Sequence, residues 1–284
     1  MVGVDLKNNK GVIMKKIMSI LMITLSLICC SNAYCENYEN NPEVCTYVIN
    51  NVNNEAEKEM AYYHRAKYYY DNGNYQQAIS DFTESIKRAT DPEGKAESIF
   101  YRAQSYYAIQ NYNDAFSDYT QVLQLANNST SQYLKELSYD VYMFRSRTAA
   151  LIGNEKIALA DANKLIQTGV VDKDPTAYGS TYFTRGAIYY SQENYPNAIS
   201  DITHYLNFPQ KLDNIGSITE TGQAYYIRGS AKLEVSKNHN DVLSAFKDLE
   251  KSIQIYAKGN SAECVREKER IIKFLKLAKQ EYYK

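Results

Sequence analysis

Apolar residues at positions 62–86 follow a helical period on either side of the polar stretch 71–74. That stretch reads Asp-Asn-Gly-Asn, which is typical of a tight turn because these residues end helices and tolerate positive φ. The pattern predicts two short antiparallel helices that need packing neighbours to stay folded. Their expected inner face holds Tyr62, Ala66, Tyr69, Ala78, Phe82, Ser85 and Ile86.

The same pattern returns four more times along the chain. Each first segment carries arginine followed by a small residue, and each second segment carries Ala-apolar-x-Asp. The arginine and the aspartate are 16 residues apart in the first four copies and 20 in the fifth, so we expect extra residues in the fifth turn, around 236–241. This spacing favours a structural ion pair within each hairpin, and the alternative is a ladder of ligand-binding arginines. The expected pairs are Arg65–Asp81, Arg102–Asp118, Arg145–Asp161, Arg185–Asp201 and Arg228–Asp248.

These residues resemble the tetratricopeptide repeat (TPR) family. The family places large apolar, small and aromatic residues in the first helix, Gly-x-Tyr at the turn, and alanine, an aromatic and a small residue in the second. The third and fifth copies match less well, with Lys232 at the aromatic position of the fifth. The resemblance implies an all-α solenoid of about five helix-turn-helix repeats.

The predicted organisation has four parts. After a leader at 1–33, residues 34–58 form a lead-in segment containing a short helix at 42–52, and the repeats occupy 59–257. Polar connectors are expected between repeats, the longest at 207–222, and an amphipathic helix at 261–284 caps the array. The five expected repeats are 59–94, 96–130, 139–172, 179–210 and 222–257.

Residues 1–33 have the features of a cleavable secretory signal. Lys15-Lys16 precede an apolar run from Ile17 to Cys30 that is too short to span a bilayer, and cleavage is expected after Ala33. Alternatives are an uncleaved anchor and lipidation at Cys29 or Cys30, and Met14 is a second candidate start. We therefore expect the protein to be periplasmic or secreted.

Cysteine and histidine usage argues against a metal site. Beyond the leader the chain has Cys35, Cys45 and Cys264, and three scattered histidines, without a CxxC motif. In an oxidising compartment Cys35 and Cys45 are candidates for a disulfide, and the alternative is that both stay reduced. No Gly-rich phosphate loop or nucleophile–base set is recognisable, so we expect no catalytic residues, no metal and no cofactor.

Charge and composition narrow the class of partner. Removing residues 1–33 takes away four Lys and one Asp, which leaves 28 basic and 32 acidic residues and a formal charge of −4. Without a basic stripe, nucleic acid and anionic membrane are poor candidates. The chain has 28 Tyr and no Trp, and tyrosines at repeat positions serve mainly in packing.

The TPR resemblance implies a concave groove lined by outward positions of each first helix. In this sequence those positions are mostly aromatic, which suits protein recognition, although the same rings also suit packing between helices. We expect a non-enzymatic scaffold that binds a protein or peptide segment in the cell envelope, or alternatively an exported effector acting on host proteins. The implied groove residues are Tyr63, Tyr70, Phe100, Tyr101, Tyr107, Phe144, Arg147, Phe183, Tyr190 and Tyr226.

Overall fold

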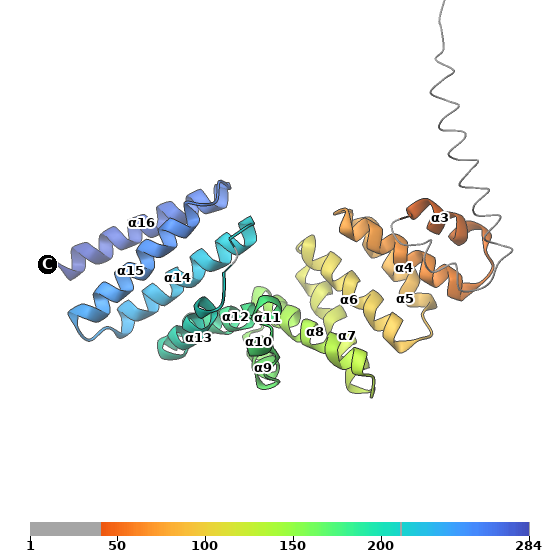
Figure 1. Cartoon of the computed structure of the whole chain (residues 1–284), viewed down its shortest axis with the longest axis horizontal. Helices are drawn as coiled ribbons and strands as arrows, with labels where there is room; N and C mark the ends of the chain where they lie inside the picture. Colours follow the sequence, from red (N-terminus) through yellow and green to blue (C-terminus); the bar gives the residue numbers. More distant parts are fainter. Residues whose placement is uncertain (1–40, 211, 284) are drawn as a thin grey trace, which may run out of the picture. The chain divides into compact units, whose positions relative to one another are not determined.

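The structure is a computed structural model that describes residues 41–210 and 212–283 (Figure 1). All regular elements in those residues are helices, which confirms the predicted all-α repeat fold. The predicted signal peptide and Cys35 lie outside the described residues. The chain divides between Ile109 and Gln110 into two compact units, and each is described by itself.

Unit one contains four described helices that pack against one another in chain order. Buried Cys45, Val48 and Ala61 join the first two, while Ala66, Ala78 and Phe82 form the core of the next hairpin. The short helix expected at 42–52 is present, and the linker that follows it is only three residues long. The helices are α3 (Pro42–Asn51), α4 (Glu55–Asp71), α5 (Tyr75–Arg88) and α6 (Pro92–Ala108).

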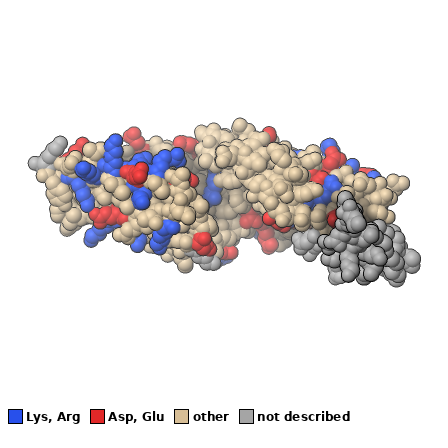
Figure 2. Space-filling view, turned by 90° about the horizontal axis from the view of Figure 1, so that it is seen from above, with Lys and Arg blue, Asp and Glu red and all other residues tan. Residues whose placement is uncertain are grey.

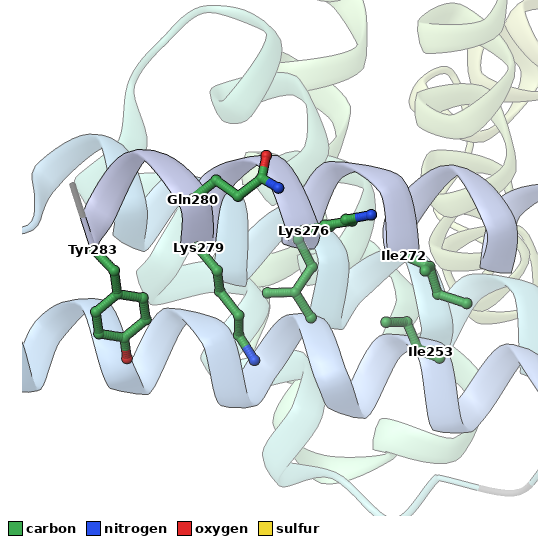
Figure 3. Close-up of a pocket in the computed structure, with 7 residues that line it drawn as sticks. Ile253, Ile272, Lys276, Lys279, Gln280 and Tyr283 are labelled. Carbon is green, nitrogen blue, oxygen red and sulfur yellow. The ribbon is translucent and has the colours of Figure 1, made fainter.

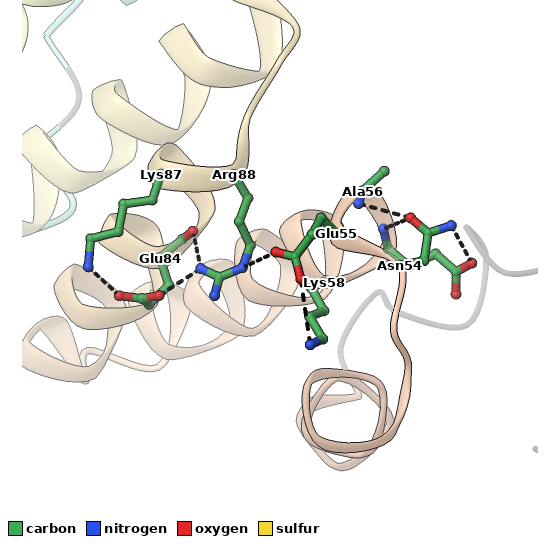
Figure 4. A network of polar contacts seen from close by, with 8 residues as sticks. Asn54, Glu55, Ala56, Lys58, Glu84, Lys87 and Arg88 are labelled. Atoms are coloured by element: carbon green, nitrogen blue, oxygen red, sulfur yellow. Dashed lines mark hydrogen bonds and ion pairs between the residues drawn. The ribbon is translucent and has the colours of Figure 1, made fainter.

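Helix α4 begins at Glu55, before Met60, where the apolar period predicts its start. The Asn54 side chain caps it, accepting a hydrogen bond from the Ala56 amide at 3.0 Å. Glu55 also pairs with Arg88 at the end of α5 over 3.1 Å (Figure 4). The first turn of α4 is therefore held by polar contacts, which an apolar period does not report.

Unit two continues the alternation of first and second helices, with two short helices inserted in the connector before α12. Three clusters of buried apolar side chains form its core. Its helices are α7 (Tyr112–Asn127), α8 (Gln132–Leu151), α9 (Glu155–Gln167), α10 (Val170–Lys173), α11 (Pro175–Tyr178), α12 (Ser180–Ser191), α13 (Tyr195–Asn207), α14 (Ile215–Val235), α15 (His239–Tyr256) and α16 (Ala262–Tyr282).

The prediction of a connector across 207–222 is wrong, because α14 begins at Ile215. Asn214 and Ser217 form a reciprocal capping box there. Gly222, which suggested a loop, lies inside the helix against Tyr256, where a Cβ atom would come within 2.7 Å of the ring. The glycine allows close packing and does not form a turn.

The prediction of a longer fifth turn is also wrong. Three residues, 236–238, separate α14 from α15, just as 72–74 separate α4 from α5. The four extra residues between Arg228 and Asp248 lengthen the two helices instead. One of them lengthens α14 after Arg228 and three lengthen α15 before Asp248, and the two side chains still meet in a bidentate contact.

Candidate partner-binding surfaces

Four of the expected arginine–aspartate pairs come together as bidentate contacts. In each, the arginine Nε and Nη2 donate to the two carboxylate oxygens over 2.6–2.8 Å. The arginine side chains are 15–17% exposed and the aspartates 5–9%. The pairs are Arg65–Asp81, Arg145–Asp161, Arg185–Asp201 and Arg228–Asp248; Arg102–Asp118 would join the two units and stays a prediction.

Each of these arginines, and Arg102 as well, also donates from Nη1 to the helix that precedes its own hairpin. We call this contact the arginine joint. Its acceptors are Thr46, Thr83, Thr120, Asn163 and Thr203, at 2.9, 3.1, 3.1, 2.7 and 3.5 Å from Arg65, Arg102, Arg145, Arg185 and Arg228.

The joint explains helix α3. Thr46 on α3 receives Arg65 as Thr83 on α5 receives Arg102, so α3 occupies the place of a second helix before the first repeat. These acceptors were not predicted from the sequence. Four of them nevertheless lie at a constant position, two residues after the aspartate of the Ala-apolar-x-Asp motif, and this spacing could have identified them.

The geometry supports a structural role for the arginines. The hydrogen bonds to Asp81 and Asp201 raise the pKa of the Arg65 and Arg185 guanidinium groups. With Nε, Nη1 and Nη2 all bound inside the protein, these arginines are already committed to helix contacts. A ligand-binding ladder would need to break them.

In the fifth hairpin a second cation joins the pair. Lys232, the residue at the aromatic position, donates from Nζ to Asp248 over 2.8 Å and to Ser244 over 3.0 Å. Its side chain is 23% exposed. The departure from the family pattern therefore adds a charge contact to a largely buried carboxylate.

The groove residues predicted on unit one form an aromatic cluster on α4 and α6. The Tyr101 ring lies 5.7 Å from Tyr70, 6.4 Å from Tyr63 and 5.5 Å from Phe100. Lys67 Nζ lies over Tyr101 at 3.9 Å from the ring centroid. Tyr107 lies near the end of α6 and is half-buried.

Tyr63 also has a polar partner, because its hydroxyl donates to Glu97 over 2.7 Å. Tyr63, Tyr70 and Tyr101 are half-buried and pack on the core around Phe82. Burial raises the pKa of the Tyr70 hydroxyl, which keeps it a neutral hydrogen-bond donor. The cluster thus serves helix packing, and part of each tyrosine ring stays reachable from outside, whereas Phe100 is buried.

The residues predicted on unit two lie on its first helices but in separate contacts. The Phe144 ring stacks on Tyr119 at 6.1 Å, and the Phe183 ring lies 5.5 Å from Tyr205. Arg147 forms an ion pair with Glu220 over 2.8 Å, which joins α8 to the N-terminal part of α14. Arg147 is therefore held internally, which its sequence position did not indicate.

Tyr190 and Tyr226 continue this surface toward α16. The Tyr190 ring lies 5.9 Å from Tyr195, and burial raises the pKa of the Tyr190 hydroxyl. The Tyr226 ring contacts Phe274 at 5.8 Å, with the Arg270 guanidinium 4.5 Å from its centroid. Helix α16 therefore packs on Tyr226 much as a following first helix would.

A polar hollow of about 310 Å³ opens beside the Arg147–Glu220 pair. Residues 208–210 and 213–214 and the starts of α12 and α14 surround it, with Tyr205, Gln210 and Glu220 among the lining residues. Burial is the main cause that raises the pKa of Tyr205, next to the Glu220 carboxylate. The hollow offers hydrogen-bonding groups to a side chain of a partner.

Neither a metal-ligand cluster nor a membrane-spanning helix is found in residues 41–210 and 212–283. In that part of the chain no group of three or more His, Cys, Asp or Glu side chains is arranged to hold a metal ion. None of the described helices combines the length and the apolar character needed to cross a bilayer.

A short part of the chain matches a known family model. Residues 60–91 match the family model described as tetratricopeptide repeat. None of the curated proteins compared with the chain matches it.

Several solved structures have a similar fold. BtubC (BKLC) from P. vanneervenii has a TM-score of 0.57 at 15% identity, covering 79% of this chain and 90% of that chain. YrrB, described as a TPR protein with an unusual peptide-binding site, has a TM-score of 0.53 at 14% identity, covering 81% and 100%. MamA from Desulfovibrio magneticus RS-1 has a TM-score of 0.53 at 14% identity, covering 72% and 98%. At these identities the likeness concerns the fold alone.

Proposed function

Because residues 60–91 match the tetratricopeptide repeat and the chain has a fold similar to that of TPR proteins, we propose that it is a non-enzymatic scaffold that binds a segment of another protein on the aromatic faces of its first helices. The observation that carries the proposal is the cluster of Tyr63, Tyr70 and Tyr101, which is half-buried on adjacent first helices. Rigid rings with part of their surface reachable give contact area at a low cost in side-chain entropy.

The arginine joints support the same role. They fix the helices through internal contacts and leave the aromatic faces as the chemically distinctive surface of unit one. YrrB, which has a similar fold, is described as having a peptide-binding site, and this is consistent with a peptide or protein partner here.

The test is site-specific photocrosslinking in living cells. We expect a photoreactive residue in place of Tyr101 or Tyr190 to capture the same protein. The control positions are Gln77 and Asn197, which are exposed on second helices. Capture from the control positions alone, or from none of the four, would contradict binding at the first helices. Circular dichroism of each variant checks that the helices remain folded.

We also propose that the protein is exported to the cell envelope, on the strength of Lys15-Lys16 and the apolar run that follows. The mature chain should then begin at Tyr34 by intact mass and fractionate with the periplasm. A lipid mass on Cys29 or Cys30 would replace this proposal with a membrane-anchored form. Recovery from the medium or from host cytosol would favour the alternative, an exported effector acting on host proteins.

A further inference from the structure

Helix α16 takes the place of a first helix after the fifth hairpin. Its Arg270 and Phe274 pack on Tyr226 of α14, and its Lys279 Nζ donates to Glu250 of α15 over 2.7 Å. In the preceding hairpins a second helix follows and covers the far side of the first helix. Within the described residues nothing covers that side of α16.

The uncovered side holds an open hollow of about 500 Å³ between α15 and α16 (Figure 3). Ile253, Ile272 and Leu275 form its apolar floor, and Lys276 and Lys279 lie along it with Gln280 and Tyr283. Ile272 is 46% exposed and Tyr283 is 64% exposed. Positions 272, 276, 279 and 283 recur at helical spacing, so they form one stripe.

The charged side chains around the hollow indicate which kind of partner it could bind. Lys279 is neutralised by Glu250, while Lys276 is exposed and has no ion pair in the described residues. Lys273 is exposed on the next turn, and Figure 2 shows several Lys and Arg side chains over this end of the molecule, with Asp and Glu side chains among them. A second copy pairing through the same face would bring lysines near lysines, which disfavours it.

We propose that this hollow, lined by α15 and α16, binds an amphipathic helix of another protein whose apolar stripe is flanked by Asp or Glu. The apolar residues of that helix cover Ile253, Ile272 and Leu275, and its carboxylates meet Lys276 and Lys273. Apolar anchors at helical spacing in a groove are a general mode of helix recognition. This surface is separate from the aromatic faces of the first helices and goes beyond the function proposed for them.

The probe is a fluorescein-labelled peptide of about 18 residues, which as a helix is longer than the stripe. It has leucines at helical spacing with glutamates on both sides, and a matched peptide carries lysines in place of the glutamates. By fluorescence anisotropy with the full chain, we expect the Glu peptide to bind at least tenfold more tightly than the Lys peptide. Its affinity should fall as salt rises, because exposed charge pairs are screened.

Three variants locate the site. Lys276→Glu should reverse the preference between the two peptides, and Ile272→Asp should weaken the Glu peptide tenfold or more. Leu277→Asp is the matched control, because Leu277 is 51% exposed on the same helix but lies outside the hollow. It should leave binding unchanged, and circular dichroism checks the folding of each variant.

Other results would overturn the proposal. Equal binding of the two peptides, or no binding of the Glu peptide, would reject acidic recognition at this hollow. A dimer in sedimentation that Ile272→Asp abolishes would identify a second copy as the occupant. Binding to vesicles containing anionic lipid that Lys276→Glu abolishes would identify a membrane surface instead. Because the crosslinking test uses Tyr101 and Tyr190, either proposal can fail without the other.

Discussion

The first hairpin, α4 with α5, and the fifth, α14 with α15, have the same arrangement of two helices but differ in the residues that hold the helices together. Both hold a bidentate arginine–aspartate pair, Arg65–Asp81 in the first and Arg228–Asp248 in the fifth. Both have a three-residue turn. The fifth has four more residues between the paired side chains, and its helices absorb all of them.

The difference shows which features of the hairpin are fixed. The length of the helices can differ, because one extra residue in α14 and three in α15 leave the arginine–aspartate pair and the three-residue turn in place. The small residue after the arginine is fixed more tightly: it is Ala66 in the first hairpin and Gly229 in the fifth. A Cβ atom on Gly229 would lie 3.0 Å from the Ala245 carbonyl oxygen and from Leu249, so the fifth hairpin leaves little room for a side chain at this position.

Replacing the aspartate should have the largest effect on stability, and the loss should differ between the two hairpins. Asp248→Ala leaves two cations, Arg228 and Lys232, without their carboxylate and should cost about 4 kcal/mol in local stability. Asp81→Ala leaves one cation and should cost about 3 kcal/mol. Hydrogen exchange of the amides in each hairpin measures both, because repeat arrays open locally. Adding Lys232→Met to Asp248→Ala should recover part of the loss; a further loss would contradict the two-cation account.

A change at the small residue should have an intermediate effect. Gly229→Val forces a branched side chain against the Ala245 backbone and should destabilise the fifth hairpin by about 2 kcal/mol. Ala66→Gly removes a methyl group that the first hairpin already holds buried and should cost about 1 kcal/mol. Chemical denaturation followed by hydrogen exchange gives both values. If Gly229→Val proved neutral, close helix approach would not be the reason for the glycine.

Variants at the arginine joints should have the smallest effect on stability. Here the first hairpin should lose more than the fifth, the reverse of the order expected for the aspartate variants. Thr46→Val removes an acceptor 2.9 Å from Arg65 and should speed exchange of the α3 amides, at a cost of about 1 kcal/mol. Thr203→Val removes one 3.5 Å from Arg228 and should change little, because a contact of that length contributes weakly. Equal effects at the two positions would show that contact length does not set the strength of the joint.

Much of the fold was predictable because periodicity and turn chemistry are local signals. The first-helix and second-helix pattern around Arg65 and Asp81 gave the hairpin directly. The early starts of α4 and α14 were not predictable in this way, since capping by Asn54 and by Asn214 with Ser217 carries no apolar period. Glycine was ambiguous as well, because Gly222 permits close packing inside a helix and resembles a loop residue in the sequence.

The candidate surfaces were predictable as positions but not as contacts. Family spacing placed Tyr101 and Arg147 on outward helix faces. It gave no information on the cluster around Lys67 or on the ion pair of Arg147 with Glu220, which lies 73 residues away. Contacts between segments that are far apart in the sequence depend on how the hairpins stack. Local sequence patterns do not show which distant segments come together.

The arginine joint has a consequence for how such a chain can change in length. Its donor lies in one hairpin and its acceptor in the one before, and the acceptor is a threonine at four of the five joints. A hairpin copied by tandem duplication of its coding segment would therefore arrive with both halves of a compatible connection. The array could therefore gain a whole hairpin without the evolution of a new polar contact between hairpins.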